Sequence, residues 1–385
     1  KAFVMAEFGV TEGFTHTDAV VLNIEEKTVE QGGRTAIPDT SARCPEDILK
    51  IITAMEQNMT DLFTGRIQPN SPAVVNADGM LSLSIPAGAL PSAADIAIRR
   101  VTDTGGLMGW FPGLRLLSPV YDIKLANGIK PVLPVTVNFR LGAGYTADNG
   151  NIAFYKLDEE TGAWEYIGGS IDINGVISVR LSGFSKYAVI ENSDLRLFKD
   201  ITPGRWSKDP IYSLTYLKIV EGEEQRGTYC FYPERNITRA EFIKMLCASL
   251  DLDKLDTNDV KLPFSDTARI PGWAAGYIRP AYKYGLVEGR TDNGRVLADA
   301  DKNITREEAC AILGRTLDIS ARPGRAYFSD RSSISEYALN YIDVLADMGV
   351  VNGNTDNTFR PGSLLTREEA AAIIDRYLKA RQARK

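Results

Sequence analysis

Short stretches rich in apolar residues recur between residues 71 and 192, and the first of them alternates apolar and polar residues. They lie at 80–85, 96–98, 120–123, 135–139, 152–155, 164–167, 176–179 and 187–190. A period of two predicts strands, and the Gly, Pro and Asn-Gly pairs between them predict tight turns. Short strands at this spacing predict an antiparallel β-sandwich over residues 71–192.

The first 70 residues give a different pattern. Residues 19–24 predict a strand, and Pro45 begins a run whose apolar residues recur at helical spacing. This stripe consists of Ile48, Ile52, Met55, Met59 and Leu62. It predicts one helix that Gly65 ends and that docks on a neighbouring sheet. Residues 1–70 are assigned to the sandwich or to an upstream domain.

Beyond the linker at 192–194, the apolar spacing becomes helical and one four-residue phrase occurs three times. The copies are Thr238-Arg239-Ala240-Glu241, Thr305-Arg306-Glu307-Glu308 and Thr366-Arg367-Glu368-Glu369. Thr followed three residues later by Glu is the capping box of a helix start. The Arg then occupies the first helical position, where a positive charge opposes the helix dipole. A guanidinium beside unpaired backbone N–H groups predicts a site for a carboxylate or phosphate.

The repeated unit is longer than the phrase. A Phe-x-Asp triplet precedes each phrase, and an aromatic-rich helical pattern and a Gly-containing turn lie between them. The triplets end at Asp200, Asp266 and Asp330, and the turns contain Gly222, Gly289 and Gly353. Such units bury their apolar faces by stacking on one another.

This pattern resembles the S-layer homology family, three of whose repeats form one wall-binding module. The resemblance covers roughly residues 195–380 and divides them into repeats at 195–260, 261–324 and 325–385. It implies an all-α, pseudo-threefold trimer, so the expected fold class is an α+β multidomain protein with the sandwich first.

The resemblance also implies a ligand, the secondary cell-wall polysaccharide of Gram-positive bacteria, capped by a pyruvate ketal on an N-acetylhexosamine. Arg367, Arg306 and Arg239 are the expected partners of the ketal carboxylate, beside the caps Thr366, Thr305 and Thr238. The three turn glycines would let backbone approach the sugar. The three Asp residues complete the predicted site, and Trp273 and Trp206 stack on sugar or close the core. No cofactor is implied.

The three copies are unequal. The third, with 353–361 intact, is closest to the family, whereas the second has Ala300 where the family prefers Pro. In the first, an insertion at 223–229 disrupts the turn. The third site is therefore the first choice, the second is next, and the first is the candidate for degeneracy. The alternative is that the Thr and Glu residues only cap helices and the Arg side chains are solvated.

The predicted sandwich resembles a domain type known from ankyrins and netrin receptors. The resemblance depends on two short phrases, at residues 85–90 and 183–189. Some relatives cleave themselves at a Phe-Ser bond, here Phe184-Ser185, with the help of a nearby His. Gly183 precedes Phe184 and the only histidine is His16, so self-cleavage is not expected. The sandwich is a candidate surface for a protein partner.

Composition narrows the functions further. A net charge of −6 argues against nucleic acid and anionic membranes as partners, and no apolar run reaches the length of a membrane helix. A single His excludes a His-rich metal site. The four cysteines allow either a Cys230–Cys247 disulfide or buried free thiols, and free thiols are the preferred interpretation. The chain begins at Lys1, which indicates a mature or trimmed fragment.

Two functions remain. The first is a non-catalytic extracellular protein held in the cell wall or S-layer by its C-terminal repeats. The second is a wall-anchored polysaccharide hydrolase whose catalytic part lies upstream or uses unrecognised carboxylates. The acidic run 158–160 lies beside a turn, where a solvated loop is preferred over a glycosidase pair.

Overall fold

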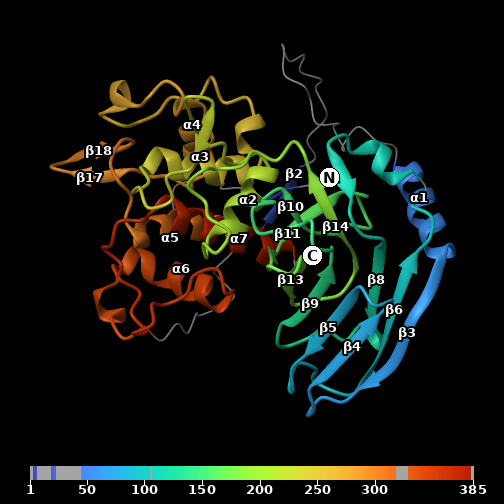
Figure 1. Ribbon diagram of the computed structural model, residues 1–385. Coiled ribbons are helices and arrows are strands. Elements are labelled where there is room, and N and C mark those ends of the chain that lie inside the picture. The colour runs from blue at the N-terminus through green and yellow to red at the C-terminus, as the bar shows by residue number, and fades with distance from the viewer. Residues whose placement is uncertain (1–2, 7–18, 23–44, 105, 318–327, 383–385) are drawn as a thin grey trace. The chain divides into compact units, whose positions relative to one another are not determined.

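The computed structural model describes residues 3–6, 19–22, 45–104, 106–317 and 328–382 (Figure 1). The chain divides into two compact units. The first contains residues 30–216 and 223–230, and the second contains 1–29, 217–222 and 231–385. In the second unit, β1 (Phe3–Ala6) pairs antiparallel with β2 (Ala19–Leu22).

Two antiparallel sheets form the body of the first unit. The larger has the order β11-β10-β14-β8-β6-β3, with β7 paired to β14, and the smaller has the order β12-β13-β9-β5-β4. The larger sheet consists of β3 (Met59–Ile67), β6 (Ala94–Val101), β7 (Leu114–Leu116), β8 (Val120–Leu125), β10 (Ile152–Leu157), β11 (Trp164–Gly168) and β14 (Lys186–Asn192). The smaller consists of β4 (Ala73–Ala77), β5 (Leu81–Ile85), β9 (Val135–Arg140), β12 (Ser170–Ile171) and β13 (Val176–Leu181).

One hydrophobic core joins the two sheets. Ile96, Ile98 and Ile123 contribute from the larger sheet, and Leu83 and Val137 contribute from the smaller. In β5 the buried and partly exposed residues alternate, as a period of two requires when one face of a strand meets the core. Every strand predicted between residues 80 and 190 is present.

The predicted helix from Pro45 to Gly65 is wrong in its second half. Helix α1 spans Pro45–Gln57, and Met59 and Leu62 lie on β3 instead. The chain bends at Asn58, whose side chain donates to the carbonyl of Ala54 at 2.8 Å and closes the helix. The following residues pair with β6 along its whole length. Tertiary pairing therefore overrides an apolar spacing that fitted a helix.

Helix α2 (Lys208–Tyr216) lies beyond the predicted linker and packs on the larger sheet. The Tyr216 hydroxyl donates to the Trp164 carbonyl at 2.7 Å, and the Tyr216 ring meets Tyr155 edge-on. The Lys208 ammonium donates to the Gly169 carbonyl at 2.8 Å. The hairpin of β15 (Glu223–Gln225) and β16 (Thr228–Cys230) belongs to the same unit.

Besides the β1–β2 pair, the described part of the second unit contains five α-helices and the hairpin β17–β18. The helices are α3 (Arg239–Ser249), α4 (Ala275–Lys283), α5 (Arg306–Gly314), α6 (Glu336–Asp347) and α7 (Arg367–Gln382). The hairpin joins β17 (Arg290–Asp292) and β18 (Arg295–Leu297), and isolated bridges pair Asn236 with Thr366, Thr238 with Asn303, and Thr305 with Leu364. The expected all-α, pseudo-threefold trimer is therefore wrong, because strands and bridges form part of the repeat region.

Short 3-10 turns complete the described elements. They span Leu107–Trp110, Ala126–Gly128, Leu252–Lys254, Thr267–Arg269 and Arg331–Ser333.

Candidate functional site

The three Thr-Arg phrases begin helices α3, α5 and α7, and each forms the predicted capping box. At α3 the Glu241 N–H donates to the Thr238 hydroxyl at 3.2 Å, and the Thr238 N–H donates to the Glu241 carboxylate at 2.9 Å. The same reciprocal pair occurs at Thr305 with Glu308 and at Thr366 with Glu369. The three Thr side chains therefore act as helix caps.

Backbone hydrogen bonds join the three helix starts in a closed ring. Ile237 donates to the carbonyl of Leu365 at 2.9 Å, Leu365 donates to that of Ile304 at 3.0 Å, and Ile304 donates to that of Ile237 at 3.1 Å. We call these three residues the apolar ring. Each is fully buried. The ring holds the three phrases at one place in the fold although 128 residues separate the first Thr from the last.

The first N–H groups of these helices are occupied. Arg239 and Ala240 donate to the carbonyls of Lys302 and Ala300 at 2.8 and 2.9 Å. The corresponding pairs of α5 and α7 donate to carbonyls of 361 and 363 and of 233 and 235, at 2.9–3.1 Å. The argument that open helix N-termini offer donors to an anion is therefore wrong, because neighbouring repeats supply the acceptors.

Arg306 and Arg367 are engaged within the chain. The Arg306 Nη2 donates to the Asn352 carbonyl at 2.7 Å, and its guanidinium lies 5.1 Å from the Phe359 ring centroid. The Arg367 Nε donates to the Phe231 carbonyl at 2.9 Å, and its guanidinium lies 4.8 Å from that ring centroid. Both guanidinium groups thus lie near an aromatic ring, but Arg306 Nε has no hydrogen-bond partner among the described residues, whereas Arg367 Nε has one.

The capping-box glutamates also serve as counter-ions for these arginines. Glu241 accepts the Thr238 N–H through Oε2 and pairs through Oε1 with Arg367 Nη1 at 3.3 Å. Glu369 lies 3.9 Å from Arg306 in the same way. Burial would raise the pKa of Glu241, but the Thr238 N–H bond and the neighbouring guanidinium groups outweigh it and lower that pKa.

Arg239 differs from the other two. It is only 8% exposed, and within the described residues its guanidinium has no hydrogen bond and no ion pair. Burial lowers the pKa of Arg239, and Glu308 and Asp299 offset this only from a distance. No aromatic ring lies under it in the described chain, because Ala298 stands at the position of Phe231 and Phe359.

The Phe-x-Asp aspartates act on backbone groups of their own repeats. Asp266 accepts the N–H groups of Ala298 and Asp299 at 2.7 and 3.0 Å. Asp330 accepts those of Phe359 and Arg360 at 2.7 and 2.8 Å. Both carboxylates thus fix the loop that leads to the next capped helix. Asp200 lies in the other compact unit.

Packing or backbone conformation favours glycine at each of the three turns, most strongly at Gly289. Gly289 has φ +84°, and a Cβ there would lie 2.6 Å from Val296 and 2.8 Å from Phe264. A Cβ on Gly353 would meet the Phe328 ring at 3.1 Å, and Gly222 has φ +69°. A role in approach to a sugar stays a prediction.

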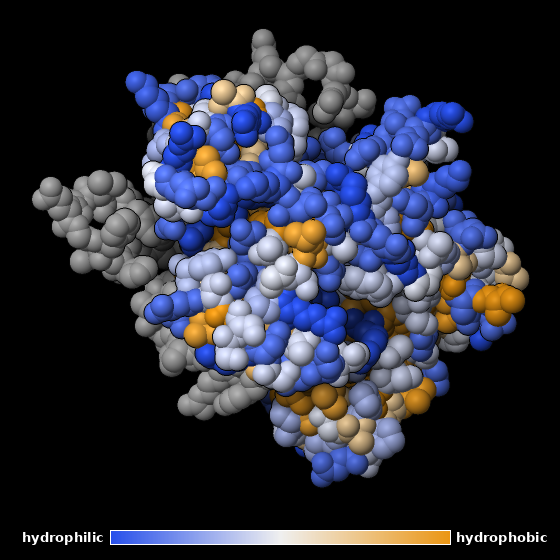
Figure 2. Space-filling model, turned by 90° about the vertical axis from the view of Figure 1, so that its left-hand side faces the viewer, coloured by the Kyte–Doolittle hydropathy of each residue, from blue (hydrophilic) through white to orange (hydrophobic). Residues whose placement is uncertain are grey.

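The predicted stacking residues are half exposed. Trp273 is 50% exposed and Trp206, in the first unit, is 56% exposed. Tyr337 occupies the equivalent place in the third repeat and is 50% exposed. Figure 2 shows a mainly hydrophilic face with small, separate hydrophobic patches. Trp273 and Trp206 therefore do not close the core, which leaves sugar stacking as the prediction.

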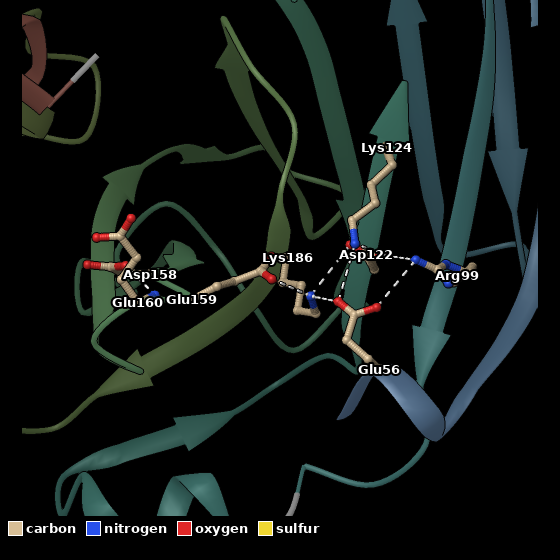
Figure 3. A network of polar contacts seen from close by, with 8 residues as sticks. All are labelled: Glu56, Arg99, Asp122, Lys124, Asp158, Glu159, Glu160 and Lys186. Carbon is tan, nitrogen blue, oxygen red and sulfur yellow. Dashed lines mark hydrogen bonds and ion pairs between the residues drawn. The ribbon is translucent and has the colours of Figure 1, made fainter. Parts of the chain in front are cut away.

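In the sandwich, the acidic run 158–160 is built into the structure. The Asp158 carboxylate accepts the Glu160 N–H at 2.9 Å and the Thr161 hydroxyl at 2.8 Å, which closes the turn. Glu159 pairs with the buried Lys186 at 2.9 Å. Figure 3 shows Glu159 reaching toward Lys186 while Asp158 and Glu160 lie farther away. The preferred solvated loop is thus wrong for Glu159.

Lys186 is the centre of this network. Its ammonium also contacts Glu56 of α1 at 2.5 Å and lies 3.9 Å from Asp122, which in turn pairs with Arg99 and Lys124 (Figure 3). Burial would lower the pKa of Lys186, but Glu56, Glu159 and Asp122 outweigh it and raise that pKa. A lysine held protonated in this way positions α1 and is unsuited to act as a base.

Cys230, Cys247 and Cys310 are free thiols, so the Cys230–Cys247 disulfide is not formed. His, Cys, Asp and Glu side chains form no metal-binding group in the part of the chain that the structure describes. None of the helices described there is long and apolar enough to cross a bilayer. His16 and Cys44 lie outside the described residues.

A family model for the S-layer homology domain matches residues 197–243, 263–294 and 327–371. The first and third matches contain a Thr-Arg phrase, and the second ends before Thr305. The C-terminal region of this chain belongs to the S-layer homology family. The three matches coincide in order and place with the three repeats.

Curated relatives share this region. An amylopullulanase of Thermoanaerobacterium thermosulfurigenes is 36% identical over 67% of this chain and 14% of its own length. An exoglucanase of Acetivibrio thermocellus is 36% identical over 46% of the chain and 16% of its length. A cellulosome-anchoring protein of Acetivibrio thermocellus is 30% identical over 39% of the chain and 33% of its length. The chain thus spans a third or less of these relatives.

The S-layer homology domains make this an extracellular protein that is anchored to the cell wall. The match to the amylopullulanase covers more of the chain than residues 195–385, so it also includes part of the sandwich.

Proposed function

We propose that this chain is a non-catalytic anchoring segment whose S-layer homology domains bind an acidic secondary cell-wall polysaccharide. The main support is that three helices begin at the apolar ring and that each has an arginine at its first position. Arginine is the side chain best suited to hold a sugar carboxylate, and the half-exposed Trp273 and Tyr337 offer faces for a sugar ring. A pyruvate ketal supplies one such carboxylate.

The sandwich supports the non-catalytic part of the proposal. Its acidic side chains around Lys186 are committed to ion pairs and turn bonds, so they are poorly placed to act as an acid and a base on a sugar. The sandwich is proposed instead to carry a surface-protein partner.

A second candidate function follows from the relatives. The 36% identity to an amylopullulanase extends into the sandwich and covers only 14% of that protein. This favours a wall-anchored polysaccharide hydrolase of which this chain is the attachment region. In that case this chain would still serve to anchor the enzyme to the cell wall.

Co-sedimentation with purified sacculi tests the proposal. The chain is expected to pellet with native sacculi and to stay in solution with sacculi whose polysaccharide has been stripped by hydrofluoric acid. Sacculi treated with mild acid, which cleaves ketals, are expected to bind less. Equal pelleting with native and stripped sacculi would exclude polysaccharide as the ligand.

A reducing-sugar assay on wall polysaccharide, starch and xylan tests the non-catalytic part. No release above the protein-free control is expected from this chain. Release of sugar at a rate proportional to protein concentration would overturn it.

A further inference from the structure

The first helices of the three repeats pack on different kinds of element. In the second and third repeats, α4 packs on α3 and α6 packs on α5, so each first helix lies against the second helix of the preceding repeat. The contact of α5 with α6 is so close that a Cβ on Gly314 would lie 2.5 Å from Cδ1 of Tyr341. Helix α2, which is the first helix of the first matched repeat, packs on β11 of the sandwich instead.

Two adjacent side chains fasten the start of α2 to a single residue of the sandwich. The Gly169 N–H donates to the Asp209 carboxylate at 3.3 Å, and the Gly169 carbonyl accepts the Lys208 ammonium at 2.8 Å. A Cβ on the preceding Gly168 would lie 2.7 Å from both carboxylate oxygens of Asp209. Glycine at the end of β11 therefore allows the helix to approach this closely.

The end of α2 is fastened at the other end of the same strand. The Tyr216 hydroxyl donates to the Trp164 carbonyl at 2.7 Å, and the Tyr216 ring lies 5.5 Å from the ring of Tyr155 and 6.5 Å from that of Tyr166. Leu214, one turn earlier in the helix, is fully buried. Helix α2 therefore runs antiparallel to β11 and is held by it at both ends.

The segment that was predicted as a linker is also held by the sandwich. The Ser193 N–H and hydroxyl both donate to the Gly113 carbonyl, at 2.8 and 3.1 Å. Phe198 is buried, its N–H donates to the Tyr212 hydroxyl at 3.3 Å, and the two rings stack with centroids 5.9 Å apart. Residues 193–198 are thus packed into the first compact unit.

The insertion that distinguishes the first repeat takes part in the same packing. It forms the β15–β16 hairpin, which belongs to the compact unit of the sandwich. The Lys199 N–H donates to the Tyr229 carbonyl at 2.8 Å, and the Arg196 guanidinium lies 4.1 Å from the centroid of the Tyr229 ring. The hairpin thus packs on the segment that leads from the sandwich into α2.

The first repeat is consequently divided between the two units. Of the matched residues 197–243, only 217–222 and 231–243 belong to the unit of the other repeats, and the remainder belongs to the unit of the sandwich. The turn at 217–222, which contains Gly222, is therefore joined covalently at both ends to segments that the sandwich holds. Release of α2 and the hairpin would free both ends of this turn.

We propose that the sandwich is a structural component of the wall anchor, because it takes for α2 the place that a preceding repeat takes for α4 and α6. A stacked helix without such a neighbour exposes an apolar face, and β11 covers that face of α2. Attachment to the wall then requires a folded sandwich, whichever wall component the repeats bind. The similarity to the amylopullulanase, which includes part of the sandwich as well as the repeats, agrees with this assignment.

The variant Leu83→Ala tests the dependence without touching α2. Leu83 is fully buried in β5 of the smaller sheet, whereas α2 packs on the larger one. We expect the variant to lower the melting temperature of the sandwich by roughly 5–15 °C, measured in the full chain by hydrogen exchange at the β5 and β9 amides. The temperature above which the chain no longer pellets with native sacculi should fall by the same amount. Val74→Ala, at a side chain that is 67% exposed on the neighbouring strand, is the control and should shift neither temperature by more than about 2 °C.

Exchange at the α3 amides provides a second readout that needs no ligand. Protection of α3 should be lost together with that of β5 and β9, in the wild type and in Leu83→Ala. Pelleting or α3 protection that remains above the melting temperature of the sandwich would overturn the inference. If the wild type fails to pellet at any temperature, polysaccharide binding is contradicted, and the α3 readout still decides the role of the sandwich.

A double variant, Lys208→Met with Tyr216→Phe, tests the contact itself. It keeps the shape of both side chains and removes their hydrogen bonds to Gly169 and Trp164. Exchange at the α2 amides is expected to accelerate at least about tenfold, and exchange at β5 and β9 less than about threefold. The same two changes at the end of α4, Lys283→Met with Tyr284→Phe, should leave α2 exchange unchanged. If the first pair does not accelerate α2 exchange beyond the second, the sandwich does not hold this helix and the inference fails.

Discussion

At the residue scale, each capping box forms within four residues of the chain, whereas Arg306 and Arg367 bind partners from distant segments. The Thr and Glu of each phrase are three residues apart, so the capping box could be read from the sequence and is present three times. The acceptors of Arg367 come from residues 126 and 136 positions away. Residue spacing along the sequence cannot predict contacts between such distant positions. The aromatic rings near Arg306 and Arg367 were not predicted for the same reason.

Gly289 provides a test of a residue whose role is packing. We expect Gly289→Ala to lower the free energy of unfolding of the S-layer homology unit by about 2–4 kcal/mol, from overpacking and left-handed strain together. Its Cβ would meet Val296, Phe264 and the Leu297 carbonyl within 2.9 Å. Urea unfolding followed by circular dichroism measures the loss.

The control lies in the same hairpin. Gly294 has φ +75° and open space around its Cβ, so Gly294→Ala carries the strain without the clash and is expected to cost about 1 kcal/mol. Equal losses in both variants would mean that packing against Phe264 does not explain the glycine.

At the element scale, alternation predicted strands well and helical spacing predicted α1 only in part. The strands from β5 to β14 that carry a clear period of two are present where expected. The stripe through Met59 and Leu62 fitted a helix, yet pairing with β6 makes that segment a strand. The hairpin β17–β18 was missed although Asn293-Gly294 is a strong turn signal, because the repeat had been assigned to helices.

Helix α1 offers a prediction about pH. Burial would raise the pKa of Glu56, but the hydrogen bonds and charges of Lys186 and Lys124 outweigh it and lower that pKa. The stability that Glu56 adds is therefore present above its unfolded pKa, and it is lost as pH falls through the folded value. The Glu56 side chain is 35% exposed, so after discount for solvent screening we expect Glu56→Gln to cost about 1 kcal/mol at neutral pH.

Hydrogen exchange of the β8 and β14 amides, measured at neutral pH and below about pH 4, checks this expectation. The difference between wild type and Glu56→Gln should shrink at the lower pH. Glu160→Gln is the matched control, since Glu160 is exposed in the same network region and lies away from Lys186 (Figure 3). A difference that persists unchanged in acid would exclude the Glu56 carboxylate as its source.

At the scale of the whole molecule, the recurring phrase predicted three repeats but not the backbone hydrogen bonds that join them. Three helix–loop–helix units with buried stripes imply stacking, and stacking alone allows each repeat to open separately. The closed backbone ring of Ile237, Leu365 and Ile304 is a different connection, because each repeat donates to one neighbour and accepts from the other. A ring has no terminal member, so opening any repeat breaks two of its three bonds.

This closure predicts that the three repeats unfold as one. Leu365 is fully buried, and we expect Leu365→Ala to cost about 2–5 kcal/mol. Because the ring transmits the loss, hydrogen exchange at the amides of Ile237 and Ile304, in the other two repeats, should accelerate by the same factor as exchange at residue 365 itself. Leu364→Ala is the control, since the adjacent side chain is 44% exposed and its loss should alter none of the three rates by more than a small factor. If Leu365→Ala accelerated exchange only within residues 328–382, the repeats would be independent stacked units.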